Sequence, residues 1–332
     1  MELVCPAGSP TALCTAVDAG ADAVYIGLRG NTNARSFAGL NFTRDELQAA
    51  VSYARQRGKR VLMALNTYPS PSAMREWLDA AGAGADAGVD AFIAADIGLL
   101  AQLAREYPAV RRHLSVQASA TSAAALQYYA DTVGIVRAVL PRVLSIQQVE
   151  RLAGKSPVEL EVFAFGSLCI MSEGRCYLSS YLTGESPNTV GVGSPASAVR
   201  WEEDRDGMSV RLNDALIDRY APNEPAGYPT LCKGRFNCGD RTRYYSLEEP
   251  VSLNTLELLP QLLDAGMSAV KIEGRQRSPV YVRQVTSVWR AAIDAARRDG
   301  HAFTPKAEWM RQLGELSEGA QTTLGAYARV WQ

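Results

Sequence analysis

The chain has 332 residues, of which 47% are hydrophobic and 21% charged, and its formal net charge is −1 at pH 7. These values are typical of a globular protein and exclude a disordered polymer. No apolar run approaches the ~18–20 residues needed to cross a bilayer, and Lys and Arg never form a run longer than a pair. Nucleic-acid binders usually carry a basic stripe. We therefore expect a soluble, cytoplasmic protein with no membrane span and no nucleic-acid partner.

Short β-rich runs alternate with amphipathic segments along the first 300 residues. Thr43 suits the cap of a helix whose apolar face is Leu47, Val51 and Ala54, and Gly88 suits a helix end directly before an apolar run. Eight such alternations predict an α/β fold, a (β/α)8 TIM-like barrel, as one domain over residues 1–300. A doubly wound sheet is the alternative, but its phosphate-binding glycine fingerprint is missing. The predicted strands are 3–5, 23–28, 60–66, 91–96, 114–118, 135–140, 160–165 and 269–272.

Residues 169–250 break this alternation. The segment is polar and rich in Gly, Pro, Asn and Asp, with little periodicity, so we predict a long irregular insertion between strands seven and eight. Such long segments in compact folds are usually functional, and this one should lie over the C-terminal face, where barrels build their active sites. The polar tail, residues 301–332, is expected to pack on the barrel or on a partner.

Four of the six cysteines lie in this insertion: Cys169, Cys176, Cys232 and Cys238. The start of the chain shows no signal-peptide pattern, so clustered cysteines favour a metal or redox role over disulfides. Thiolates prefer iron–sulfur clusters, zinc or copper(I). With only two histidines in the chain, a zinc site would be almost entirely sulfur. The alternative is that each cysteine packs as a small apolar residue.

Polar residues at the predicted strand ends form a second candidate site. Asn66 and Gln117 suit the orientation of a polar ligand, and Arg275 in the following loop could hold a carboxylate or phosphate. Alternation along 271–273 turns Lys271 and Glu273 into the barrel, either as an internal ion pair or as substrate contacts. A hydrolase is disfavoured, because the motifs of serine and zinc hydrolases are missing and the one histidine near a strand lies at its start.

The segment 161–179 resembles the signature of the collagenase-like peptidases, family thirty-two of the unassigned peptidases. Segments 3–8 and 270–279 extend the resemblance, and 181–191 and 252–260 are similar to the branch that serves oxygen-independent ubiquinone biosynthesis. The likeness covers residues 1–300. The matching positions in the signature are Glu161, Phe163, Gly166, Ser167, Cys169, Gly174, Cys176 and Ser179.

The resemblance implies a 4Fe-4S cluster on four cysteines. Cys169 and Cys176 match the first two ligands and Cys232 the last, whereas the position of the third is Gly193. Three outcomes are open: Cys238 substitutes as a ligand, one iron is open or labile, or no cluster persists.

The resemblance also implies a function. The chain would be the iron–sulfur subunit of an oxygen-independent hydroxylation system acting on the aromatic ring of ubiquinone precursors, with prephenate as hydroxyl donor. A homologous UbiV-like iron–sulfur protein would be its heterodimer partner, and a lipid carrier could deliver the substrate. The alternatives are a tRNA or rRNA hydroxylation enzyme of the same family, or a scaffold subunit with an incomplete cluster site. Protease activity is not expected.

Overall fold

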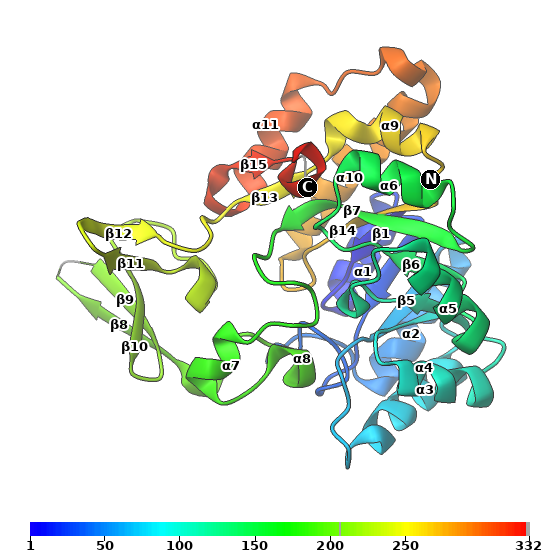
Figure 1. Ribbon diagram of the computed structural model, residues 1–332, viewed down its shortest axis with the longest axis horizontal. Helices are drawn as coiled ribbons and strands as arrows, with labels where there is room; N and C mark the ends of the chain where they lie inside the picture. The colour runs from blue at the N-terminus through cyan, green and yellow to red at the C-terminus, as the bar shows by residue number, and fades with distance from the viewer. Residues whose placement is uncertain (206, 330–332) are drawn as a thin grey trace.

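Eight parallel strands close into a barrel in the computed structural model, which describes residues 1–205 and 207–329 (Figure 1). The eighth strand pairs with the first on one side and with the seventh on the other, which closes the ring. The predicted TIM-like barrel is thereby confirmed. Its strands are β1 (Glu2–Pro6), β2 (Ala23–Ile26), β3 (Arg60–Leu65), β4 (Ala91–Ala94), β5 (Arg111–Leu114), β6 (Arg137–Val139), β7 (Glu159–Ser167) and β14 (Ala269–Ile272).

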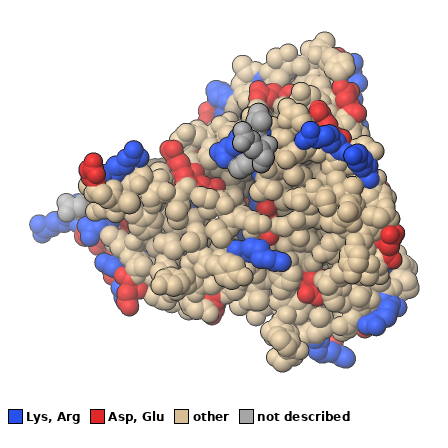
Figure 2. All heavy atoms as spheres, in the orientation of Figure 1, with Lys and Arg blue, Asp and Glu red and all other residues tan. Residues whose placement is uncertain are grey.

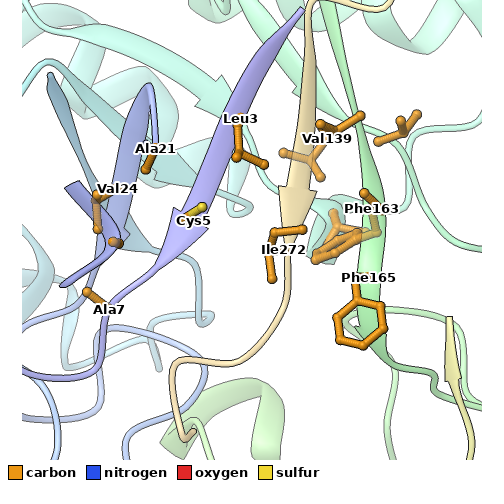
Figure 3. Packing of buried hydrophobic residues seen from close by; sticks show 14 of the residues in the cluster. Leu3, Cys5, Ala7, Ala21, Val24, Val139, Phe163, Phe165 and Ile272 are labelled. Carbon is orange, nitrogen blue, oxygen red and sulfur yellow. The ribbon is translucent and has the colours of Figure 1, made fainter. Parts of the chain in front are cut away.

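Helices surround the barrel and bury its outer face. Thr43 caps its helix through a reciprocal capping box with Glu46, as the sequence indicates. Leu3 and Cys5 of β1 pack beside Ile272 of β14 in the main hydrophobic cluster (Figure 3). In the described part of the chain, no helix is both long and apolar enough to cross a membrane. The helices are α1 (Pro10–Asp18), α2 (Arg44–Gln56), α3 (Met74–Ala87), α4 (Ile97–Glu106), α5 (Ala123–Val133), α6 (Ile146–Ala153), α9 (Leu259–Asp264) and α10 (Pro279–Asp299).

The fifth strand differs from its prediction. We placed it at 114–118, but β5 ends at Leu114 and residues Val116–Ala118 form a 3-10 turn. The hydroxyl of Ser115 accepts a hydrogen bond from the backbone N–H of Gln117, a local bond that competes with strand pairing. This early end turns Gln117 over the barrel mouth.

The insertion is not irregular, which corrects the sequence prediction. It contains a three-stranded antiparallel sheet and a hairpin, which extend to one side of the barrel in Figure 1. A small core, Val210, Leu212 and Ile217, lies beneath the sheet. Strand β8 (Val199–Asp204) is exposed along most of its length, so the apolar alternation there is weak. The elements of the insertion are α7 (Leu178–Thr183), α8 (Pro187–Val190), β8, β9 (Gly207–Leu212), β10 (Ala215–Tyr220), β11 (Arg235–Cys238) and β12 (Arg241–Tyr245). Strand β13 (Ser252–Asn254) follows the insertion.

The described part of the tail lies against the barrel. Helix α11 (Ala307–Leu316) contacts α10, and β15 (Thr322–Thr323) pairs with β13, which itself pairs antiparallel with β7. Tyr327 is buried. The predicted tail runs to residue 332, and residues 330–332 lie outside the described part. This path carries the residues after α11 to the end of β7, where the first cysteine of the cluster follows.

Candidate functional site

A pocket opens at the C-terminal ends of the barrel strands. The residues predicted to bind substrate, Asn66, Gln117, Glu273 and Arg275, all line it. Cations outnumber anions on the wall of this pocket, because four basic side chains line it together with one carboxylate, that of Glu273. The charged lining residues are Arg35, Arg142, Lys271, Glu273 and Arg275.

Glu273 is held by an arginine that the sequence analysis missed. The Nε of Arg35 lies 3.2 Å from Oε1 of Glu273, and the backbone N–H of Ser167 donates to its other oxygen at 3.4 Å. Burial alone would raise the pKa of Glu273, but the guanidinium groups of Arg35 and Arg142 lower it below its ordinary value. Arg35 comes from the long connection between β2 and α2, and that length is the one sequence signal of its role.

The lowered pKa of Glu273 gives a testable pH dependence. A carboxylate whose pKa is lower in the folded state stabilises the protein above its unfolded pKa, and the contribution disappears as pH falls through the folded value. We expect Glu273→Gln to lower the free energy of unfolding at pH 7 and to have a smaller effect near pH 3. Urea unfolding at both pH values measures this, and an equal loss at both would contradict the ionic role.

Arg275 lies deeper than the predicted loop position. It is 3% exposed, and its NH1 donates to the side-chain oxygen of Asn33 at 2.9 Å and to that of Asn41 at 3.4 Å. Desolvation by burial lowers its pKa to about 10. No carboxylate in the described residues is within ion-pair distance of Arg275. The side chain therefore anchors the β2–α2 connection, which carries Arg35, and also reaches the pocket wall.

Asn66 and Gln117 line the same pocket, but they differ in whether their side chains are hydrogen-bonded. The side-chain oxygen of Asn66 accepts from the backbone of Ala34 at 3.0 Å, and its amide donates to Ser115 at 3.2 Å. Gln117 bonds through its main chain, with its carbonyl accepting from the hydroxyl of Tyr68 at 2.7 Å. Asn66 thus holds the connection beside Arg35 in place, while the side-chain amide of Gln117 is available to a ligand.

A second pocket adjoins the first and is lined by three of the four clustered cysteines. Cys169, Cys176, Cys232 and Gly193 all line it, so the structure brings together the three matched ligand positions and the position of the missing one. Cys238 is exposed in β11 and does not line this pocket. The two pockets share Ala34, Arg35, Gln117 and Arg142.

The three thiols in this pocket, called the thiol pocket below, influence one another electrostatically. Desolvation raises the pKa of Cys169, and Arg142 opposes this rise. Desolvation also raises the pKa of Cys232, whose Sγ donates to the hydroxyl of Thr230 at 3.3 Å. In the described residues, no three Cys, His, Asp or Glu side chains are placed as a ready metal-binding group. The three thiols are the kind of donor that an iron–sulfur cluster takes, and loops rather than strands carry them.

Two charged residues, Arg142 and Glu318, join the thiol pocket to the barrel. The Nε of Arg142 lies 3.0 Å from Glu173, and its NH1 donates to the carbonyl of Ser167 at 2.6 Å. Glu318, from the tail, accepts from the hydroxyl of Ser167 at 2.5 Å and pairs with the ammonium of Lys233. Because Ser167 is two residues before Cys169 and Lys233 follows Cys232, Glu318 ties the two cysteine segments together.

Gly174 lets the segment between the first two cysteines pass close to the barrel. Its φ is +74°, and an added Cβ would lie 2.1 Å from the carbonyl oxygen of Gln117. We expect Gly174→Ala to lower the free energy of unfolding by about 1–3 kcal/mol through backbone strain, with a further loss from the clash, and to displace Cys176. The control is Gly184→Ala, which has a similar φ of +75° and no atom within 4 Å of the added carbon. Equal losses in thermal unfolding for both variants would contradict the close approach.

The fold and the pockets define a (β/α)8-barrel protein with a ligand site at its C-terminal mouth and a thiol pocket beside it. The model of peptidase family U32 matches residues 8–327. The chain belongs to this family, which confirms the resemblance at the family level.

Three relatives with curated names are similar over most of the chain. A tRNA hydroxylation protein P1 of Bacillus subtilis (strain 168) is 31% identical and covers 95% of this chain and 68% of its own length. An uncharacterized protease of Methanocaldococcus jannaschii is 32% identical, and the match covers 99% of this chain and 73% of the relative. A tRNA hydroxylation protein P of Escherichia coli (strain K12) is 29% identical, covering 89% and 68%.

Proposed function

We propose that this chain is the iron–sulfur subunit of an oxygen-independent hydroxylation system that acts on the aromatic ring of ubiquinone precursors, as the UbiU branch of the family does. The observation that carries the proposal is the thiol pocket, with Cys169, Cys176 and Cys232, directly beside the charged barrel mouth. The names of two relatives support hydroxylation as the reaction class. The resemblance in 181–191 and 252–260 supports the quinone branch.

The residues of the two pockets have different proposed roles. Cys169, Cys176 and Cys232 would hold the 4Fe-4S cluster, which supplies electron transfer or Lewis acidity when bound. Arg142 and Arg35 stand on the shared wall and would bind and orient an anionic hydroxyl donor such as prephenate through charge-assisted hydrogen bonds. Glu273 holds Arg35 in place, and Gln117 offers its amide to a polar ring substituent.

The proposed partner is a homologous UbiV-like iron–sulfur protein in a heterodimer, and a lipid carrier could present the apolar quinone precursor. The exposed residues Tyr177 and Tyr181 beside the thiol pocket are suited to such a contact, because aromatic residues are enriched at interfaces. Light scattering with and without the partner tests this. A mass that stays monomeric on mixing would argue against the heterodimer.

The second candidate is hydroxylation of tRNA, favoured by the names of the relatives. These names conflict with our expectation that nucleic acid is no partner. Basic and acidic side chains are interspersed on the face shown in Figure 2, and phosphate-backbone binding would favour a continuous basic area. A third candidate is a scaffold subunit whose cluster site is incomplete at Gly193.

Deletion of the gene, followed by anaerobic growth, separates these functions. We expect ubiquinone to fall and hydroxylated intermediates to be missing, while the modified nucleosides of tRNA and rRNA stay unchanged. Loss of a hydroxylated nucleoside with normal ubiquinone would instead establish the RNA function. Complementation by a Cys169→Ala variant would support the scaffold, because that role needs no thiol ligand.

A further inference from the structure

We infer that the carboxylate of Glu248 is the fourth ligand of the metal centre in this chain, in place of the cysteine that Gly193 lacks. The inference rests on the proposed iron–sulfur function and names a ligand that neither the family resemblance nor the cysteine pattern provides. It concerns a residue that follows the hairpin β11–β12 and lines the thiol pocket.

Glu248 lies between the two cysteine segments. Its backbone N–H donates to the carbonyl of Cys232 at 3.1 Å, and its carboxylate accepts a hydrogen bond from the backbone N–H of Ile170, the residue after Cys169. The side chain therefore bridges the loops that carry the first and the last matched ligand, and its charge acts on both thiols.

One carboxylate oxygen of Glu248 is unpaired in the part of the chain that the structure describes. Oε2 is buried and makes no hydrogen bond within the described residues, although a buried carboxylate oxygen without a partner is costly. The other two carboxylates on the wall of the thiol pocket are already committed, since Glu173 pairs with Arg142 and Glu318 pairs with Lys233. Of the acids lining this pocket, Glu248 is thus the one that forms no ion pair within the described residues and that holds a buried oxygen without a hydrogen bond there.

The other donor considered for the fourth position does not reach the site. Cys238 is exposed and interacts with Tyr244 of the same hairpin. Three thiolates and one carboxylate would complete four ligands, and a harder oxygen ligand binds a sulfide-rich iron site less firmly than a fourth thiolate would. We therefore expect a cluster that assembles in this chain but loses iron more readily than a four-cysteine site.

Position 193 has room for the cysteine of the family pattern. An added Cβ would lie 3.3 Å from Oγ of Ser179 and 4.0 Å from Cγ2 of Thr230, and Thr230 accepts the hydrogen bond from Cys232. A modest shift of the Ser179 hydroxyl would accommodate it. Gly193→Cys can therefore serve as a rescue variant that makes Glu248 dispensable.

The test compares iron and acid-labile sulfide per chain in full-length protein that is purified without oxygen. We expect Glu248→Gln to retain less than half of the iron of the unmodified chain and to lose the rest faster to a chelator. The double variant Gly193→Cys/Glu248→Gln should recover the iron content of Gly193→Cys alone. The matched control is Glu249→Gln, because Glu249 is exposed and bonds to Gln321; it should change nothing. Circular dichroism checks that every variant is folded.

Each result separates the two proposals. Unchanged iron in folded Glu248→Gln would overturn the ligand role of Glu248 and leave the iron–sulfur function intact. Failure of Gly193→Cys to rescue Glu248→Gln would also overturn it, since it would show that Glu248 acts by shaping the pocket or balancing Lys233. If the unmodified chain holds no iron but the Gly193→Cys variant does, the ligand role of Glu248 is contradicted and the iron–sulfur function is not. Absence of iron from both would overturn the proposed cofactor itself.

Discussion

Replacing Cys232 with alanine is expected to lower the iron content of anaerobically purified protein by more than about tenfold, because even the loss of an outer-shell partner of a metal ligand commonly costs that much affinity. Cys232 lines the thiol pocket next to position 193, on the segment that Glu318 and Glu248 hold. On the proposed function, hydroxylated quinone intermediates should also disappear in cells that carry this variant. Iron analysis and visible absorbance provide the measurements.

The natural control for Cys232→Ala is Cys238→Ala. Cys238 is exposed in the hairpin and lies outside the wall of the thiol pocket, so we expect this variant to keep its iron and its activity. Loss of iron from Cys238→Ala would instead make Cys238 a ligand and require the hairpin to bend toward the barrel. Full iron in Cys232→Ala would contradict the cluster assignment.

The second large effect is expected inside the barrel, at Glu161. This fully buried carboxylate lies 2.6 Å from the ammonium of Lys271 and 3.4 Å from the guanidinium of Arg137. Removing one partner of a buried ion pair leaves an uncompensated charge and commonly costs about 3–5 kcal/mol. We expect Glu161→Gln to lower the free energy of unfolding by an amount in that range, measured by urea denaturation.

Asp79→Asn provides the comparison for Glu161→Gln. Asp79 pairs with Arg75 at 2.9 Å on the exposed face of α3, where water screens the charges, so a much smaller loss is expected. Similar losses for the two variants would show that the barrel interior admits water to Lys271 and Arg137. The sequence had left two interpretations of Lys271 open, and the structure contains an ion pair to Glu161 on a residue that also lines the mouth pocket.

The barrel could be predicted from sequence because its strands are buried on both faces. Continuous apolar runs such as that of β4 are distinctive, and short connections leave few ways to arrange them. The small sheet of the insertion could not be predicted in the same way, because β8 is exposed along most of its length and its alternation carries no apolar signal. The end of β5 was misplaced because one hydroxyl, that of Ser115, decides it.

In the candidate site too, the sequence predicts some residues and not others. Glu273 could be predicted, since alternation along β14 fixes the direction of its side chain. Arg35 could not, because only the folded path of the β2–α2 connection brings it 3.2 Å from a residue 238 positions away. Glu248 and Glu318 lie in polar sequence segments without hydrophobic periodicity. Their roles depend on tertiary contacts, which the local sequence pattern does not predict.

The carboxylate of Glu318 has a consequence for transplanting this chemistry. A graft of residues 169–250 onto another barrel would carry all the matched cysteines and Glu248. It would leave behind the acid that fastens Lys233 to Ser167. It would also leave behind Arg142, the partner of Glu173. Recombination would therefore have to move at least the insertion and the segment after α11 together, two pieces of chain that are separate in the sequence.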